Sequence, residues 1–228
     1  MNIFTHGGAT GDIVFSLPTI KAMGGGKLII HSFHKQRYES IKKLIEVQDY
    51  IDSVEWSDYK FGDAIDLDKF RGYASHHQNL VEAHFHGQNL SVEQNQWWRD
   101  GWLTLPDNQV MLNGIKYAVI NRTTNYADPN FNWANEVAYL RTIADEVFFI
   151  GYPDEFLLFN SKFGTDVKYF PCDFLEGAYL IKNAVMFTGC YSAWSTIAMG
   201  LGLTYRLEQA PNHTCSSLLM PRETIINV

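Results

Sequence analysis

Apolar and polar positions in the first third of the chain follow two different periods. Short apolar runs at 2–6 and 27–32 are typical of buried strands. Residues 12–23 and 36–47 instead repeat their apolar positions at helical spacing. The runs at 52–56 and 63–67 again indicate strands. Because strands alternate with helices, we expect a parallel α/β sheet here.

The same alternation returns in the second half of the chain. Helices are predicted at 133–145, at 192–202 and from Asp173 onward, where Glu176 follows at capping-box spacing. Strands are predicted at five places, with the last one ending the sheet: 116–123, 146–152, 166–170, 184–189 and 204–208.

The middle of the chain has weak periodicity. Residues 73–102 are polar and aromatic, and we expect one helix near 78–86 with loop after it. Residues 107–114 contain Asn, Asp and Gly, which favour a linker. We therefore predict two α/β domains, 1–110 and 111–228.

Composition narrows the function classes. The 228 residues carry a net charge of -7, which argues against a protein that coats duplex nucleic acid. The three cysteines form no C-x-x-C pair, which suits a reducing compartment. No apolar run reaches the roughly 18 residues of a membrane span, and no signal-peptide pattern opens the chain, so we expect a cytoplasmic protein.

The glycine-rich turn GGATGDIV places a lone carboxylate, Asp12, where a strand leads into a helix. Gly8 and Gly11 would let a substrate approach the backbone closely, and Thr10 belongs to the same acceptor loop. Asp12 would then act as a general base for a hydroxyl, or it caps the helix. The dinucleotide fingerprint fails because His6 stands in place of its first glycine, and no P-loop lysine follows.

A second turn, FTGCYSAWSTIAMGLG, resembles a phosphate cradle. Thr188 and Gly189 end a strand, and Ser192 and Ser195 stand at the start of a helix whose amides suit a diphosphate. Close packing of a small-residue helix on a sheet explains the same pattern.

A third group follows the strand at 116–123. Arg122 would bind phosphate in forked geometry beside Thr123 and Thr124, or it is a surface arginine. Glu208, at the end of the last predicted strand, would bind a ribose or is a solvated edge residue.

These pieces, in this order, resemble the heptosyltransferase-like glycosyltransferases of family 9. The first motif is similar to the family's GD, hydrophobic pair, polar residue and LP, and DAIDLD (63–68) is similar to its "D-x-x-I-D-L" strand. FIGYPDE (149–155) resembles its "G-G-x-x-D/E" strand end, and 187–202 resembles its "D-S/T-G-x-x-H-x-A-x-A-L-G" segment.

The resemblance implies the GT-B architecture, with two Rossmann-like domains that face each other across a cleft and a trimmed N-terminal domain. It implies an inverting transfer from a nucleotide sugar, with Asp12 as base and no metal or other cofactor. The donor would contact residues of the second domain: Arg122, Thr123, Thr124, Thr188, Gly189, Ser192, Ser195 and Glu208. The acceptor would be a lipid-linked or surface saccharide, or a hydroxymethylated nucleic-acid base.

The chain departs from the family at Phe187 and Ser192, where the family has aspartate and histidine, and it lacks the lysine before Trp133. These departures favour an alternative, a degenerate module that binds a nucleotide or nucleotide sugar without turnover. Two other signals are weaker. Asp66 and Asp68 spell the D-x-D of metal-dependent transferases. The remaining signal is a set of histidines and tryptophans that line an acceptor site or pack in a core: His76, His77, His84, His86, Trp97 and Trp98.

Overall fold

The computed structural model of the chain describes residues 1–31, 35–74, 79–106, 112, 114–208 and 224–226. They divide into a first unit, Met1–Pro106 with Gly200–Gly202, and a second unit that holds the remaining described residues. The predicted boundary at 110 and 111 lies outside the described residues. The expected cleft between two domains stays a prediction.

The first unit is built on a four-stranded parallel sheet with the order β3-β2-β1-β4. Its strands are β1 (Asn2–His6), β2 (Gly26–His31), β3 (Ile51–Ser57) and β4 (Ile65–Asp66). The predicted parallel α/β sheet is confirmed, although β4 is shorter than the pattern at 63–67 indicated. Its helices are α1 (Thr10–Ala22), α2 (Lys35–Glu46), η1 (Leu67–Gly72), α3 (Leu80–Gly87) and η2 (Glu93–Asp100).

Helix α1 runs through Pro18 without ending there. A proline has no N–H, so the carbonyl four residues earlier, on Val14, loses its helical donor. The indole Nε1 of Trp102 donates to that carbonyl over 3.0 Å. The helix therefore keeps its proline because a distant tryptophan satisfies the exposed backbone group.

The segment after α3 differs from the predicted loop. Residues Glu93–Asp100 form the 3₁₀ turns of η2, and Trp98 within them is fully buried. Only Trp98 of the two adjacent tryptophans is buried and the rest of η2 is polar, which explains why the periodicity is weak.

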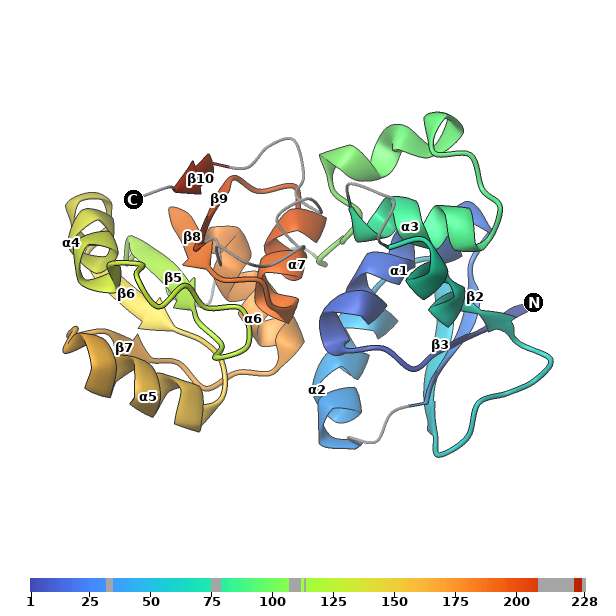
Figure 1. Cartoon of the computed structure of the whole chain (residues 1–228), viewed down its shortest axis with the longest axis horizontal. Helices are drawn as coiled ribbons and strands as arrows, with labels where there is room; N and C mark the ends of the chain where they lie inside the picture. Colours follow the sequence, from blue (N-terminus) through green and yellow to red (C-terminus); the bar gives the residue numbers. More distant parts are fainter. Residues whose placement is uncertain (32–34, 75–78, 107–111, 113, 209–223, 227–228) are drawn as a thin grey trace. The chain divides into compact units, whose positions relative to one another are not determined.

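The second unit is built on a six-stranded parallel sheet with the order β10-β9-β8-β5-β6-β7 (Figure 1). Its strands are β5 (Tyr117–Asn121), β6 (Glu146–Phe149), β7 (Lys168–Tyr169), β8 (Met186–Gly189), β9 (Tyr205–Glu208) and β10 (Thr224–Ile226). The strand at 204–208 does not end the sheet, because β10 pairs with β9.

Four helices accompany this sheet: α4 (Trp133–Ile143), α5 (Pro153–Phe163), α6 (Phe174–Asn183) and α7 (Ala193–Gly200). The sequence pattern did not predict α5. Its start is nevertheless encoded, since Pro153 occupies the first turn and the Glu155 carboxylate accepts the N–H of Tyr152. Gly164 ends it with a φ of 58°.

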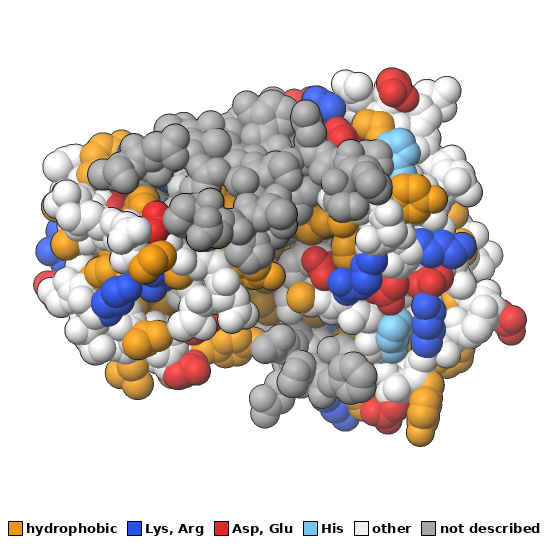
Figure 2. Space-filling model, in the orientation of Figure 1, with side chains coloured by type: hydrophobic (Ala, Val, Ile, Leu, Met, Phe, Trp, Pro, Cys, Tyr) orange, Lys and Arg blue, Asp and Glu red, His pale blue; other side chains and the backbone are white. Residues whose placement is uncertain are grey.

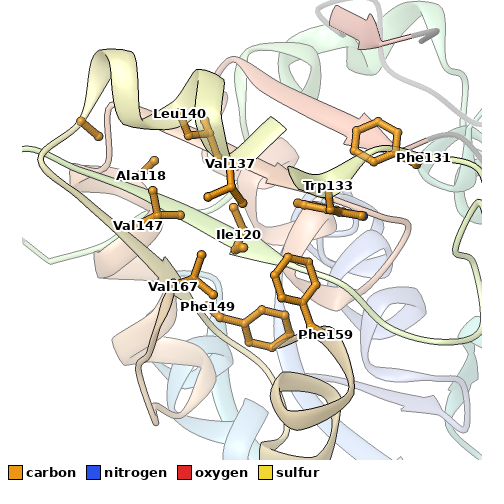
Figure 3. Packing of buried hydrophobic residues seen from close by; sticks show 11 residues of the cluster. Ala118, Ile120, Phe131, Trp133, Val137, Leu140, Val147, Phe149, Phe159 and Val167 are labelled. Atoms are coloured by element: carbon orange, nitrogen blue, oxygen red, sulfur yellow. The ribbon is translucent and has the colours of Figure 1, made fainter. Parts of the chain in front are cut away.

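Figure 3 shows apolar side chains of β5, β6, α4 and α5 converging in one core. Ile120, Trp133 and Phe159 lie at its centre and are at most 1% exposed. Each such buried side chain contributes roughly 1.5–3 kcal/mol. This core holds the end of β5 rigidly.

Candidate functional site

Asp12 lies in the first turn of α1, directly after the β1–α1 loop (residues 7–9). Its Oδ2 accepts the N–H of Ala9 over 3.1 Å, so the side chain does cap the helix start. The side chain is 22% exposed, and the guanidinium of Arg71 stands 3.5 Å from the same oxygen. Burial raises the pKa of Asp12, an effect that Arg71 and the Ala9 amide oppose.

Asp68, at the start of η1, joins three segments of the first unit. Its Oδ2 accepts the N–H of Gly7 over 2.9 Å and lies 3.1 Å from His31 Nε2. Its Oδ1 lies 3.3 Å from His6 Nδ1 and 3.9 Å from Arg71 Nε. The carboxylate thereby connects the ends of β1 and β2 with the element that carries Arg71.

His6 is fully buried beneath the loop. Its Nδ1 accepts the N–H of Gly8 over 2.9 Å, so that nitrogen carries no proton and the ring is neutral. Burial lowers the pKa of His6 to about 4. Burial also lowers the pKa of His84, whose ring stacks on Phe70. Both histidines are structural parts of this corner.

Gly8 is required by close packing. A Cβ at this position would stand 2.5 Å from His6 Cε1 and 2.8 Å from the Cβ of Asp12. Thr10 and Gly11 follow in the first turn of α1 and are half-buried. The four residues predicted from the first motif, Gly8, Thr10, Gly11 and Asp12, thus lie together in the β1–α1 loop and the first turn of α1.

Figure 2 shows acidic, basic and histidine side chains gathered over one part of the first unit. Asp12, Asp68 and Arg71 supply alternating charges at the corner described above.

In the second unit, Ser192 and Ser195 stand at the start of α7. The Ser192 N–H donates to Ser195 Oγ over 3.0 Å, and Ser192 Oγ donates to Asn121 Oδ1 over 2.7 Å. Asn121 also donates to the Ile150 carbonyl. The side-chain amide of Asn121 therefore connects the ends of β5 and β6 with the start of α7. Asn121 also lies beside Gly189, the last residue of β8.

Thr188 is buried, and its hydroxyl donates to Glu136 over 3.0 Å. The other Glu136 oxygen pairs with Arg206 at 3.0 Å. Burial raises the pKa of Glu136, against the effect of Arg206 and Thr188. The Thr188 hydroxyl thus has a partner within the unit.

Arg122 and Glu208 form a buried ion pair. Arg122 Nε donates to both carboxylate oxygens, at 3.2 and 3.0 Å, and its NH2 donates to one of them at 3.1 Å. Trp133 Nε1 and the N–H of Asp128 complete the set at 2.9 and 2.7 Å. Arg122 is 7% exposed and Glu208 is fully buried. The alternative interpretations of Arg122 as a surface arginine and of Glu208 as a solvated edge residue are therefore wrong.

Thr123 and Thr124 continue from Arg122. The N–H of Thr123 donates to the thiol sulfur of Cys190 over 3.1 Å, whereas Thr124 is exposed. Burial raises the pKa of the Cys190 thiol to about 11, so this cysteine is unreactive at neutral pH.

Sequence reasoning missed His6, Asp68, Arg71 and Asn121 as parts of these corners. Three of them stand at or just after strand ends, where parallel sheets gather their functional groups. Their position at the predicted strand ends is the sequence signal that could have identified them.

The weaker sequence signals have structural partners. Asp66 accepts the N–H of Asp68 and pairs with Lys60. The two carboxylates of the D-x-D motif therefore bond to different groups. Among the described residues, no three His, Cys, Asp or Glu side chains are grouped to hold a metal ion. His76 and His77 lie outside the described residues. Trp98 packs in the core, and Lys21 stands over the ring of Trp97.

Of the helices that the structure describes, none combines the length and apolar character that crossing a bilayer requires.

Comparison with solved structures shows which fold this is. A glycosyl transferase of family 9 from Veillonella parvula superposes with a TM-score of 0.72 at 9% identity, over 98% of this chain and 84% of that one. The E. coli heptosyltransferase WaaC with ADP-2-deoxy-2-fluoro heptose gives 0.59 at 12% identity, over 99% of this chain and 93% of that one. E. coli ADP-heptose lps heptosyltransferase II gives 0.57 at 10% identity, over 100% and 91%.

No protein-family model matches the chain, and no curated protein sequence matches it either. The likeness is therefore one of fold, and it covers nearly the whole chain.

Proposed function

We propose that this protein is an inverting glycosyltransferase that moves a sugar from a nucleotide sugar to an acceptor hydroxyl. Its fold is that of the family 9 glycosyltransferases, two of which carry heptosyltransferase names. The observation that carries the proposal is Asp12, a partly exposed carboxylate with a raised pKa at the first strand-to-helix corner. A base with a raised pKa accepts a proton more readily than a free carboxylate does.

In the proposed step, Asp12 removes the proton of the acceptor hydroxyl as its oxygen attacks the anomeric carbon. The bond from that carbon to the diphosphate oxygen breaks, and the nucleoside diphosphate leaves with the bonding electrons. Configuration at the anomeric carbon inverts because attack and departure occur on opposite faces. The step needs no metal if the amides of the first turn of α7 stabilise the departing charge.

In this proposal the first unit supplies the base and the second unit holds the donor. Ser192, Ser195 and Gly189 would shape the backbone around the diphosphate, with Thr123 and Thr124 beside them. Arg122 and Glu208 would not contact the donor, because each already bonds to the other. They would support the site by holding the loop after β5 in place. A saccharide acceptor fits the negative net charge better than a nucleic acid does.

The test is release of nucleoside diphosphate from a panel of nucleotide sugars with saccharide acceptors. We expect Asp12→Asn to lower kcat by roughly 10²–10⁴-fold, the usual contribution of a general base, while donor binding by calorimetry stays intact. Asp52→Asn is the matched control, because Asp52 is an exposed carboxylate on β3. An Asp12→Asn enzyme with the normal rate would refute the proposed base.

A second candidate is a module that binds a nucleotide or nucleotide sugar without turnover. The departures from the family pattern at Phe187 and Ser192 favour it. Tight donor binding without diphosphate release, across all acceptors, would support this candidate over the enzyme.

A further inference from the structure

We propose that Asp68 and Arg71 are positioning residues for the Asp12 carboxylate, an inference that rests on the proposed function. Asp68 accepts the N–H of Gly7 at the start of the β1–α1 loop, and its Oδ1 stands 3.9 Å from Arg71 Nε. Arg71 NH2 contacts the oxygen of Asp12 that also accepts the Ala9 N–H. The three side chains form a chain of alternating charge from η1 to the start of α1.

The β1–α1 loop that leads to Asp12 is held at its first two residues. Asp68 accepts from Gly7, and the ring of His6 accepts from Gly8. His31 covers the other side, since a Cβ on Gly7 would stand 2.2 Å from its Cε1. A loop so constrained presents Asp12 in one position, and loss of one anchor would let it move.

Arg71 is the link between the two carboxylates. Its NH2 stands 3.5 Å from Asp12 Oδ2 and its Nε 3.9 Å from Asp68 Oδ1. Its side chain is 56% exposed, so these pairs add little to stability. Its contact with Asp12 Oδ2 still favours one orientation of that carboxylate, because the donors of a guanidinium point in fixed directions.

The charges have opposite consequences for Asp12. The positive charge of Arg71 favours the ionised carboxylate, whereas the negative charge of Asp68 disfavours it. Other titratable groups around this corner come from β1, β2 and α3: His6, His31 and His84. Burial lowers the pKa of His6 to about 4 and the pKa of His84 well below its ordinary value, so these two rings are neutral at neutral pH.

The first experiment needs no substrate. The carboxyl carbons of ¹³C-labelled aspartates are titrated by NMR, with the Asp12 signal assigned from its loss in Asp12→Asn. We expect Arg71→Gln to move the Asp12 midpoint to higher pH and Asp68→Asn to move it to lower pH. Asp52→Asn, the exposed control, should leave it in place.

Opposite shifts show that both charges act on Asp12, and the kcat and KM measurement below then tests positioning. Asparagine at position 68 still accepts the Gly7 N–H, so Asp68→Asn removes the charge while leaving that hydrogen bond. If it fails to fold, Arg71→Gln decides alone, because Arg71 is exposed. An unchanged Asp12 midpoint in Arg71→Gln, or shifts in the same direction in both variants, would overturn the proposal.

The second experiment measures turnover in the same variants. We expect kcat to fall roughly tenfold with the donor KM unchanged, as for a displaced catalytic group. A fall confined to donor KM would contradict the proposal. Absence of turnover in the unaltered protein would instead refute the proposed function, and the NMR titration would still decide whether η1 controls Asp12.

Discussion

Glu208 ends β9 with a carboxylate that accepts from Arg122, Trp133 and the Asp128 amide. The sequence places a glutamate at the end of a strand, a position that suits a ribose ligand. The three donors come from 75 to 86 residues away along the chain, so no local pattern predicts them. Fully buried and bonded on both oxygens, Glu208 holds the loop after β5.

The buried ion pair of Arg122 and Glu208 leads to a prediction about stability. Arg122→Met should cost about 3–5 kcal/mol of the second unit's free energy of unfolding, because it leaves a buried carboxylate without its counter-ion. The control is Arg141→Met, whose side chain is 45% exposed and pairs with Asp166, so it should cost less than about 1 kcal/mol.

The measurement is hydrogen exchange of the β5 and β9 amides in increasing urea, which reports on the second unit alone. Equal losses in the two variants would show that the buried pair contributes no more than the surface pair does.

Helix boundaries in this chain were predictable where a capping group stands next to its backbone partner. Asp173 and Glu176 each accept the other's N–H at 2.9 Å, as the capping-box spacing predicted. The start of α1 was harder, since Ala9 offers no side-chain oxygen and Asp12 caps from within the helix. Its passage through Pro18 depends on Trp102, which no window around the proline contains.

The cap of α6 can be tested directly. Asp173→Ala should destabilise the second unit by about 1 kcal/mol, because the Glu176 amide loses its acceptor. Asp173→Ser keeps an oxygen at the same place and should restore most of the loss. The free energies come from urea denaturation followed by exchange of α6 amides, and an alanine variant as stable as the serine variant would contradict the cap's contribution.

Both units consist of parallel strands joined by helices, and alternating patterns in the sequence predicted that class. They did not predict strand order. In the first sheet β1 lies between β2 and β4, and in the second β5 lies between β6 and β8. Order depends on which crossover buries the most apolar surface, and that is a property of the folded units.

The first unit should lose stability in mild acid. His6 and His84 have lowered pKa values because they are buried, so the unfolded chain binds protons below about pH 6.5 that the folded unit does not. Stability should fall as the pH drops from 6.5 toward 5, by at most about 1.4 kcal/mol per pH unit for each histidine that stays neutral in the folded unit.

The check is urea denaturation at pH 7.5, 6.5 and 5.5, with exchange of β1 amides as the probe. Burial also raises the pKa of Asp12 in this unit and of Glu136 and Glu208 in the second unit, and these carboxyls act in the opposite direction as the pH falls. A first unit equally stable at pH 7.5 and 5.5 would contradict the buried, neutral state of these histidines.

The chain's local patterns determine that strands and helices alternate, that Asp12 follows the first strand, and that small hydroxyl residues open α7. Each of these depends on neighbours a few residues apart, where spacing alone sets geometry. The folded units alone determine that Arg122 bonds to Glu208, that Trp102 supports Pro18, and that Asp68 reaches Gly7. Those contacts join residues 61 to 88 positions apart, and burial sets their strength, so the linear order of residues does not contain them.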